Sequence, residues 1–356
     1  MAVHTTLGLG GPAEWFVEAA DAATVSEVLR WAADASLAVH VLGGGSNLVV
    51  ADRGVDGVVL HVTLRGIDVR TEGRDVLVEV AAGEPWDPFV ERAVAERWAG
   101  VECLAGIPGT VGATPIQNVG AYGQEIAEVV DSVTVLDRTS RTVRRVGSSA
   151  CGFGYRTSVF RRHSDRAVVL AVTFRLRVGG APAVRYRELA AVVGNRVTKP
   201  RLDEVRAAVL DLRRTKSMVL EEDDPNRRSV GSFFVNPLLD AEDADRVACR
   251  AVESGAAASL EAVPRFATED GRVKIPAAWL IEAAGFGKGY RRGAVGLSSA
   301  HALALVHHGG GSTRDLLALA GDIRATVRAR FGVTLEPEPI AWGFDGSDVL
   351  DAHSAL

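Results

Sequence analysis

The N-terminal part of the chain alternates apolar runs and polar turns in a pattern typical of mixed helices and strands. Apolar residues recur at helical spacing from 24 to 33, starting at the capping-box sequence Thr24-Val25-Ser26-Glu27. Short apolar runs at 38–42, 48–50 and 58–62 predict strands after this helix. This order predicts a β-α-β-β arrangement.

The same reading continues through the middle of the chain. A polar turn at 137–140 separates two alternating runs, which predicts a hairpin. The predicted elements are a strand at 76–80, a helix at about 87–98, hairpin strands at 129–136 and 142–146, a strand at 167–178 and a helix at 202–214.

Helix signals dominate the C-terminal third. Pro276 opens a predicted helix that Gly285 ends, and Ser312 begins a capped helix that runs to Phe331. Residues 336–343 are predicted to be extended. The charged, proline-containing stretch 221–228 predicts a mobile loop.

Composition narrows the class of protein. The 356 residues are 47% hydrophobic and 24% charged, which is typical of a globular chain of two or three domains. A net charge of −5 argues against a nucleic-acid partner. Three scattered cysteines lack a zinc-site spacing and fit a reducing compartment. With no signal peptide or membrane-length apolar run visible, we expect a cytoplasmic protein without membrane insertion.

The segment 106–123, GIPGTVGATPIQNVGAYG, carries five glycines and almost no charge. Glycine allows positive φ angles and close approach of the main chain to a ligand. Two X-Pro units, Ile107-Pro108 and Thr114-Pro115, stiffen the segment, so it does not resemble a flexible linker. The sequence therefore predicts a rigid main-chain cradle for a large ligand.

A second glycine-rich segment, LGGGSN at 42–47, directly follows a predicted strand. Successive main-chain N–H groups in such a loop can bind a pyrophosphate, although a simple tight turn is an equal alternative for this segment alone. Together with 106–123, it favours a nucleotide ligand held by main-chain dipoles.

Other familiar motifs do not support a function. Residues 8–13 match GxGxxG/A, but no predicted strand precedes them and Pro12 interrupts them, so we interpret the match as chance. A P-loop is absent from the sequence, and VGSFF around Ser232 is not a GxSxG elbow. His307-His308 are interpreted as a solvated loop, and we expect no metal site.

Three further segments complete a recognisable set: GYRTSVF at 154–160, GSFFVNP at 231–237 and LEPE at 335–338. With the two glycine-rich segments, they closely resemble the enolpyruvyl-UDP-N-acetylglucosamine reductases of peptidoglycan precursor synthesis. The resemblance runs from about residue 5 to 343. These enzymes belong to the FAD-binding superfamily that includes vanillyl-alcohol oxidase.

The resemblance implies an α+β fold of the vanillyl-alcohol oxidase type. It implies a two-part FAD-binding region, 1–66 and 67–214, with the C-terminal strand 335–356 joined to the second part. A C-terminal α+β substrate-binding domain would span 215–334. It also implies non-covalent FAD, NADPH as hydride donor and a UDP-sugar substrate, and we expect a monomer.

The resemblance places catalysis at Arg156, Ser232 and Glu338. Hydride addition to an enolpyruvyl ether builds an enolate, which an arginine and a protonated carboxyl group can stabilise. A polarised serine hydroxyl in a dry site can then protonate the α carbon.

Binding residues are implied by the same match, with Gln117 and Asn118 as further residues of the flavin loop. The cofactor-binding residues implied are Gly43, Gly44, Gly45, Ser46, Asn47, Gly106, Ile107, Pro108, Gly109, Gly112, Ala113, Gly120, Ala121 and Gly123. The substrate-binding residues implied are Tyr122, Tyr155, Tyr186, Lys216, Asn236 and His301.

The chain also departs from the family pattern. Pro339-Ile340 stands where the family usually has Val-Arg, and the segment between Lys216 and Ser232 is longer and more acidic than the commonest form. Because FAD is held non-covalently in this group, Cys103 is interpreted as a packed thiol. The alternatives are an FAD-dependent alcohol or sugar oxidase of the same superfamily, and a nucleotide-binding scaffold without catalysis.

Overall fold

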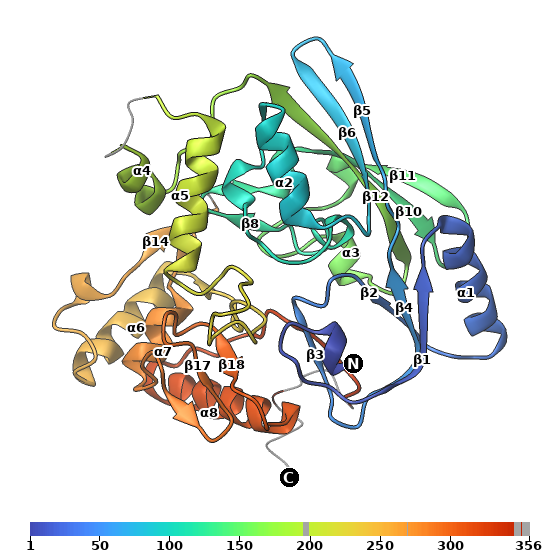
Figure 1. The fold of residues 1–356 in the computed structure, drawn as a ribbon. Helices are drawn as coiled ribbons and strands as arrows, with labels where there is room; N and C mark the ends of the chain where they lie inside the picture. Colours follow the sequence, from blue (N-terminus) through green and yellow to red (C-terminus); the bar gives the residue numbers. More distant parts are fainter. Residues whose placement is uncertain (195–198, 269, 345–349, 351–356) are drawn as a thin grey trace. The chain divides into compact units, whose positions relative to one another are not determined.

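The computed structural model describes residues 1–194, 199–268, 270–344 and 350, and the chain folds into two compact units (Figure 1). Unit 1 comprises Met1–Pro12, Ser46–Val55 and Glu221–Leu356, and unit 2 comprises Ala13–Gly45 and Asp56–Leu220. The chain therefore passes from unit 2 to unit 1 inside the GGGSN segment. In the described residues, no helix combines the length and the hydrophobicity needed to cross a membrane.

Unit 2 begins with a three-stranded sheet in the order β1-β4-β2. These strands are β1 (Ala13–Ala19), β2 (Val39–Leu42) and β4 (Val55–Val62), and β2 pairs with β4 in parallel. Helix α1 (Ala22–Asp34) buries Val25, Val28 and Leu29. Its N-cap is Asp21, whose carboxylate accepts a hydrogen bond from Thr24 N at 2.7 Å. The helix is confirmed, but it begins before the predicted capping box.

A larger antiparallel sheet in the order β11-β10-β12-β6-β5 forms the middle of unit 2, with β7 paired to β12. The hairpin register Val133↔Val146 confirms the turn predicted between β10 and β11. The strands are β5 (Ile67–Glu72), β6 (Asp75–Ala81), β7 (Trp98–Ala99), β10 (Val130–Asp137), β11 (Val143–Gly147) and β12 (Ala167–Val178).

Four helices and a short hairpin complete unit 2. They are α2 (Trp86–Ala95), α3 (Val159–Arg162), α4 (Arg187–Gly194), α5 (Leu202–Arg214), β8 (Gly120–Ala121) and β9 (Gln124–Glu125). The side chains of Trp86, Phe89 and Phe174 pack together, with Phe89 stacked on Phe174 at 5.1 Å between ring centroids. One continuous apolar core runs through unit 2 and includes residues on both sides of the predicted boundary at 66.

Unit 1 has its own core, in which Phe233, Phe234 and Phe331 are buried. Helix α8 (Thr313–Phe331) begins at the predicted capping box of Ser312 and Asp315 and ends at Gly332, whose φ is +78°. The other elements are β3 (Leu48–Val50), β13 (Leu238–Leu239), α6 (Ala241–Glu253), β14 (Phe266–Ala267), β15 (Val273–Lys274), α7 (Ala277–Ala283), β16 (Arg291–Arg292), β17 (Val295–Leu297), β18 (Leu305–His307) and β19 (Ile340–Trp342).

Several features differ from the sequence prediction. Strand β5 and helix α6 were not predicted; α6 buries mainly alanines, which give a weak apolar signal. Strand β1 stands where the predicted β-α-β-β arrangement has its first strand, for which no residue range was predicted. His307 is not in a solvated loop: it ends β18, is buried, and its ring nitrogens contact Leu7 O at 3.1 Å and Gly311 N at 3.2 Å. The predicted loop 221–228 is anchored by Asn226, which is 5% exposed.

The C-terminal strand also pairs differently from expectation. Within 336–343, only Ile340–Trp342 forms a strand, and it runs parallel to β3 in unit 1. The sequence prediction joins it to 67–214 instead. Because the observed pairing is made by main-chain groups, the departure at Pro339-Ile340 does not prevent it. The division into three predicted domains stays a prediction.

Candidate functional site

The two glycine-rich segments contact each other directly within unit 2. A Cβ atom added to Gly44 would lie 2.7 Å from Gly109 Cα, and one added to Gly43 would lie 2.7 Å from Thr110 Oγ1. Gly112 is equally confined, since its added Cβ would lie 2.5 Å from Ala82 Cβ. Real Cβ atoms do not approach other heavy atoms this closely, so Gly44 and Gly112 leave no room for a side chain, whereas at Gly43 the Thr110 hydroxyl can rotate away.

The paired segments leave main-chain donors available for a ligand. In the described residues, the N–H groups of Gly43, Gly44, Gly45, Gly109 and Thr110 form no hydrogen bond with the protein. Unpaired N–H groups on two adjacent loops suit an anionic ligand such as a diphosphate. The residues present therefore fit the diphosphate of FAD.

The start of the second glycine-rich segment is fixed by charged side chains from α2 and α5. Gly106 has a φ of +70° and donates its N–H to Asp87 Oδ1 at 2.6 Å. Arg213 Nη2 donates to Gly106 O at 3.3 Å and to Met218 O at 2.6 Å. One guanidinium thus joins the glycine-rich segment to the turn that carries Lys216.

Arg156 is held against the far end of the same segment. Its Nη2 donates to Gly120 O at 2.9 Å, and its guanidinium lies 5.6 Å from the centre of the Tyr155 ring. Asn118, 1% exposed, supports this end, because its Nδ2 donates to Glu125 Oε2 at 2.7 Å and to Gly154 O at 3.1 Å.

Tyr122, Tyr186 and Lys216 form a second cluster in unit 2. The Tyr122 and Tyr186 rings meet edge to face at 5.5 Å, and Lys216 Nζ lies 5.8 Å from the centre of the Tyr122 ring. Lys216 also pairs with Glu188 at 2.6 Å. Burial raises the pKa of Tyr122 to about 12, so its hydroxyl keeps its proton and can donate a hydrogen bond.

In unit 1, the structure brings the Ser232 and Glu338 motifs together. Phe233 N donates to Leu303 O at 2.8 Å, and Phe233 O accepts from Glu338 N at 2.9 Å. The residues after Ser232 therefore lie between the segment around Leu303 and the LEPE segment. An antiparallel bridge between Phe234 and Pro337 continues this pairing.

Asn47 contacts the same place from the end of the first glycine-rich segment. Its side-chain Nδ2 donates to the main-chain oxygen of Glu338 at 3.4 Å, and its main-chain oxygen accepts from Ile340 N at 3.0 Å. Asn47, which is predicted to bind the flavin, therefore contacts Glu338, which is predicted to be catalytic. Arg156 belongs to unit 2.

The remaining predicted residues of unit 1 also have structural partners. Asn236 Oδ1 accepts from Ala277 N at 2.9 Å and so satisfies a free donor at the start of α7. His301 N donates to Ser298 Oγ at 3.3 Å. Asn226 bonds Ser299 at 3.0 Å, which ties the 221–228 segment to the turn that carries His301.

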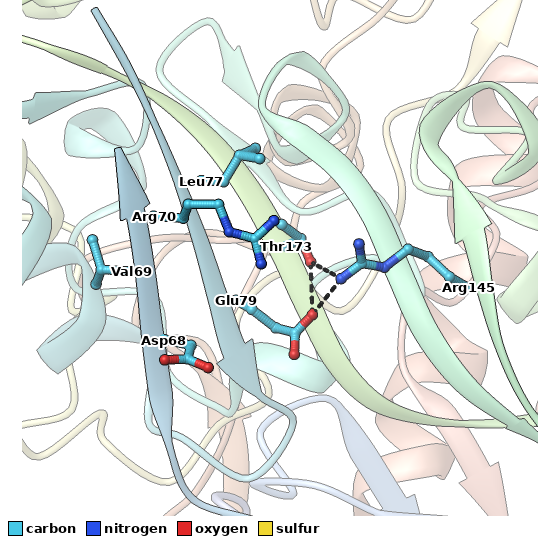
Figure 2. A pocket seen from close by; sticks show the side chains of 7 residues that line it. All are labelled: Asp68, Val69, Arg70, Leu77, Glu79, Arg145 and Thr173. Carbon is cyan, nitrogen blue, oxygen red and sulfur yellow. Dashed lines mark hydrogen bonds and ion pairs between the residues drawn. The ribbon is translucent and has the colours of Figure 1, made fainter. Parts of the chain in front are cut away.

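A cavity of about 270 Å³ lies elsewhere, over the face of β5, β6, β11 and β12 (Figure 2). Glu79 accepts from Arg145 at 2.5 Å and from Thr173 Oγ1 at 3.3 Å, as the dashed lines in Figure 2 show. The cavity contains none of the predicted site residues. We interpret it as the charged outer face of a sheet.

Sequence reasoning missed several supporting residues. Asp87, Arg213, Glu102 and Gln124 all bond to the loops that carry the candidate site. The sequence signal for them is weak, because three lie in or beside ordinary helical stretches and none belongs to a glycine-rich motif.

Comparisons with known proteins identify the family of both parts of the chain. The FAD binding domain family matches residues 13–145, and the C-terminal domain family of UDP-N-acetylenolpyruvoylglucosamine reductase matches residues 223–342. The UDP-N-acetylenolpyruvoylglucosamine reductase of Salinispora arenicola is 49% identical over 95% of this chain and 93% of its own. That of Thermobifida fusca is 48% identical over 96% of both chains.

A solved structure agrees with the fold. The UDP-N-acetylenolpyruvylglucosamine reductase from Thermus caldophilus covers 96% of this chain and 97% of its own, with a TM-score of 0.64 and 23% identity. At that identity, the likeness concerns the fold alone.

The match to the FAD binding domain family and the paired glycine-rich segments define an FAD-binding protein. With near full-length relatives at 49% and 48% identity, the chain belongs to the UDP-N-acetylenolpyruvoylglucosamine reductase family. Its function is that of a reductase in peptidoglycan precursor synthesis, with FAD as cofactor; NADPH is the reductant of this family.

Proposed function

We propose that this protein reduces the enolpyruvyl group of UDP-N-acetylglucosamine enolpyruvate to give UDP-N-acetylmuramate. The observation that carries the proposal is the hydrogen bond from Glu338 N to Phe233 O at 2.9 Å. It joins the Ser232 motif to the Glu338 motif, although about a hundred residues separate them in sequence. FAD, when bound, supplies the chemistry of accepting a hydride from NADPH and delivering it to the substrate.

Different residues are proposed to bind different parts of the cofactor. Gly43, Gly44 and Gly45 present unpaired main-chain N–H groups, and Gly109 and Thr110 present others beside them. These donors would hold the FAD diphosphate, and Ser46 and Asn47 would add side-chain donors. The other predicted cofactor residues, from Gly106 to Gly123, would line the flavin through their main chain.

Arg156 is proposed to stabilise the negative charge that develops when hydride adds to the enolpyruvyl double bond. Its guanidinium is always protonated and carries five N–H groups, one of which donates to Gly120 O, so a positive charge is fixed at the end of the glycine-rich segment. The φ of +53° at Arg156 sets the direction from which this side chain leaves the turn.

Ser232 is proposed to donate the proton that completes the reduction. Hydride forms one C–H bond, the double-bond electrons move to the enolate, and the Ser232 hydroxyl proton forms the C–H bond at the α carbon. Glu338, in its protonated form, would donate a hydrogen bond to the enolate. The serine then regains its proton from water.

Further side chains are proposed to contact the substrate. Lys216 would bind phosphate oxygens, with Tyr186 and Tyr122 beside the UDP group, and Tyr155 would support Arg156. Asn236 and His301 would contact the substrate from their turns in unit 1. The edge-to-face contact of Tyr122 and Tyr186 supports this set, because it orders both rings before a ligand arrives.

The test measures two steps separately in the variant Ser232→Ala: reduction of the flavin by NADPH, and reoxidation of the flavin by the enolpyruvyl substrate. NADPH should bleach the flavin at the unmodified rate, whereas reoxidation by the enolpyruvyl substrate should slow by about 10²- to 10⁴-fold. Ser254→Ala, on the exposed end of α6, is the matched control and should change neither step. Unchanged reoxidation in Ser232→Ala would refute the role of Ser232.

The same measurement addresses the alternatives. Rapid reoxidation of reduced flavin by air without a UDP sugar would indicate an oxidase, and a flavin that NADPH cannot bleach would indicate a scaffold. The cytoplasmic location and the monomeric state stay predictions.

A further inference from the structure

Glu102 is a fully buried carboxylate that the proposed reaction does not use. Its exposed fraction is 0%, and it accepts hydrogen bonds from Gly100 N at 2.8 Å, Ala183 N at 2.7 Å and Gln124 Nε2 at 3.3 Å. In the described residues, no lysine, arginine or histidine forms an ion pair with it. Buried polar oxygens are costly unless they accept hydrogen bonds, so the three segments that supply these donors are held close together by Glu102.

The neighbouring Cys103 reinforces the same contact. Its N–H donates to Gln124 Oε1 at 2.9 Å, and its Sγ donates to Ala183 O at 3.0 Å. Burial, with a smaller effect of the Glu102 charge, raises the pKa of Cys103 to about 12, so the thiol keeps the proton that it donates. Both main-chain polar groups of Ala183 are therefore bound by this pair of residues.

The segment around Ala183 has few other main-chain anchors. It lies between β12 and α4, and in the described residues the main chain of 181–185 forms no hydrogen bond with another main-chain group. An exposed ion pair between Arg185 and Glu128 at 2.9 Å adds a polar contact to this segment. We call the two hydrogen bonds that Glu102 and Cys103 make with the main chain of Ala183 the clamp. The clamp therefore fixes the position of this segment.

The residues that come directly after Ala183 belong to the cluster proposed to bind substrate. Tyr186 N would lie 3.5 Å from a Cβ added to Gly123, so the segment runs directly over the end of the glycine-rich loop. Tyr186 meets Tyr122, and Glu188, on the first turn of α4, pairs with Lys216 at 2.6 Å.

We infer that Glu102 is a positioning residue for substrate binding: by holding Ala183, it keeps Tyr186 beside Tyr122 and Glu188 beside Lys216. The inference rests on the proposed function, because it needs Tyr186 and Lys216 to contact the UDP sugar. A segment already ordered in its binding position loses less conformational entropy when substrate binds. Glu102 itself touches neither substrate nor the reacting atoms.

The experiment compares Glu102→Gln with Glu128→Gln, each as the FAD-loaded protein. Gln at 102 keeps the side-chain size but has only one acceptor oxygen. It therefore cannot accept from Gly100 N on one oxygen and from Ala183 N and Gln124 Nε2 on the other, and at least one of these bonds is lost. We expect the KM for UDP-N-acetylglucosamine enolpyruvate to rise at least about tenfold, with kcat and NADPH bleaching within about threefold. Glu128→Gln removes the charge of the exposed ion pair to the same segment and keeps an oxygen that can accept from Glu125 N, so it should leave KM within about twofold.

Hydrogen exchange gives a readout that does not depend on turnover. The Ala183 amide should exchange at least about tenfold faster in Glu102→Gln, while amides of α5 stay unchanged. An unchanged KM together with unchanged Ala183 exchange would overturn the inference. A parallel loss of flavin bleaching and substrate affinity would overturn it too, since it would indicate a general structural role.

Two provisions keep the outcome clear. If Glu102→Gln does not fold, Cys103→Ala removes the thiol bond to Ala183 O and keeps the carboxylate; KM should then rise about threefold, and unchanged KM and exchange would count against the clamp. If the unmodified protein does not reduce the enolpyruvyl substrate, the proposed function fails, while Ala183 exchange still decides whether Glu102 holds the segment.

Discussion

At the scale of single residues, unusual backbone conformations gather at the candidate site. Asn118, Tyr122 and Arg156 have φ angles of +46°, +49° and +53°, and Ser217, next to Lys216, has +52°. Non-glycine residues adopt this region at a cost of about 1 kcal/mol or more, and such residues are concentrated at functional sites. Here the cost is offset by fixed bonds such as those of the Asn118 amide, which hold the turns in place.

The cysteines allow a prediction at the same scale. Burial raises the pKa of Cys103 to about 12 and that of Cys151 to about 11, whereas Cys249 is exposed. At pH 8 the buried thiols stay almost fully protonated, and the reactive thiolate becomes abundant only as the pH approaches those values. In the native protein, iodoacetamide should modify Cys249 at least about 100-fold faster than Cys103 or Cys151, measured by peptide mass spectrometry. Unfolding in guanidinium should equalise the three, and fast native labelling of Cys103 would contradict the prediction.

At the scale of elements, the two glycine-rich segments form a single binding surface. They pack so closely that a side chain added at Gly44 would collide with the main chain of the other segment. Gly44 and Gly109 touch through main-chain atoms, and Gly106 is enclosed by Leu210 and Val219. This packing explains why the segments are rigid without belonging to a helix or a long strand. It also places their unpaired N–H groups on adjacent turns.

Gly44→Ala tests this packing. The new Cβ would lie 2.7 Å from Gly109 Cα, a main-chain atom that cannot rotate away, so the loops must separate. We expect a loss of about 1–3 kcal/mol in the free energy of unfolding, measured in urea, and at least about tenfold weaker FAD binding. Gly147→Ala, at the end of β11, is the control because no heavy atom lies within 4 Å of its added Cβ. Equal FAD affinity in the two variants would contradict the role given to the contact.

At the scale of the whole molecule, each compact unit has a core of its own, yet each is built from separate stretches of chain. Unit 1 combines the first residues, Ser46–Val55 and the C-terminal part, and unit 2 takes the rest. The GGGSN segment crosses the boundary, with Gly45 in one unit and Ser46 in the other. A cofactor bound along this segment would stabilise the folded chain, because it binds the folded form and not the unfolded one.

The predicted consequence is a flavin that heat releases and that stabilises the protein. Boiling and centrifugation should leave FAD in the supernatant, identified by chromatography, since the site needs no covalent bond. Removing FAD should lower the melting temperature, and adding it back at 100 times its Kd should restore about 2.7 kcal/mol. Riboflavin, which lacks the diphosphate, should restore little because the unpaired N–H donors would stay unused. Flavin retained in the precipitate, or equal rescue by riboflavin, would contradict this prediction.

Much of the fold was predictable where a local sequence pattern is compatible with only one secondary structure. Helix α8 begins at its capping box and ends at a glycine, and the hairpin of β10 and β11 follows its alternating residues. Elements without such signals were missed: α6 buries alanines, and most of β5 is exposed. His307 was predicted to be solvated because glycines follow at 309–311, but Leu7, which its ring contacts, is 300 residues away in sequence.

The sequence by itself determined the class of ligand and the residue types of the chemistry, because glycine spacing and short motifs encode local backbone freedom and reactivity. Tertiary structure decided which residues distant in sequence come into contact. It paired Gly44 with Gly109, set the strand after Glu338 along β3, and buried Glu102 among donors from three segments. Such contacts depend on packing between residues distant in sequence, and no local pattern records that packing.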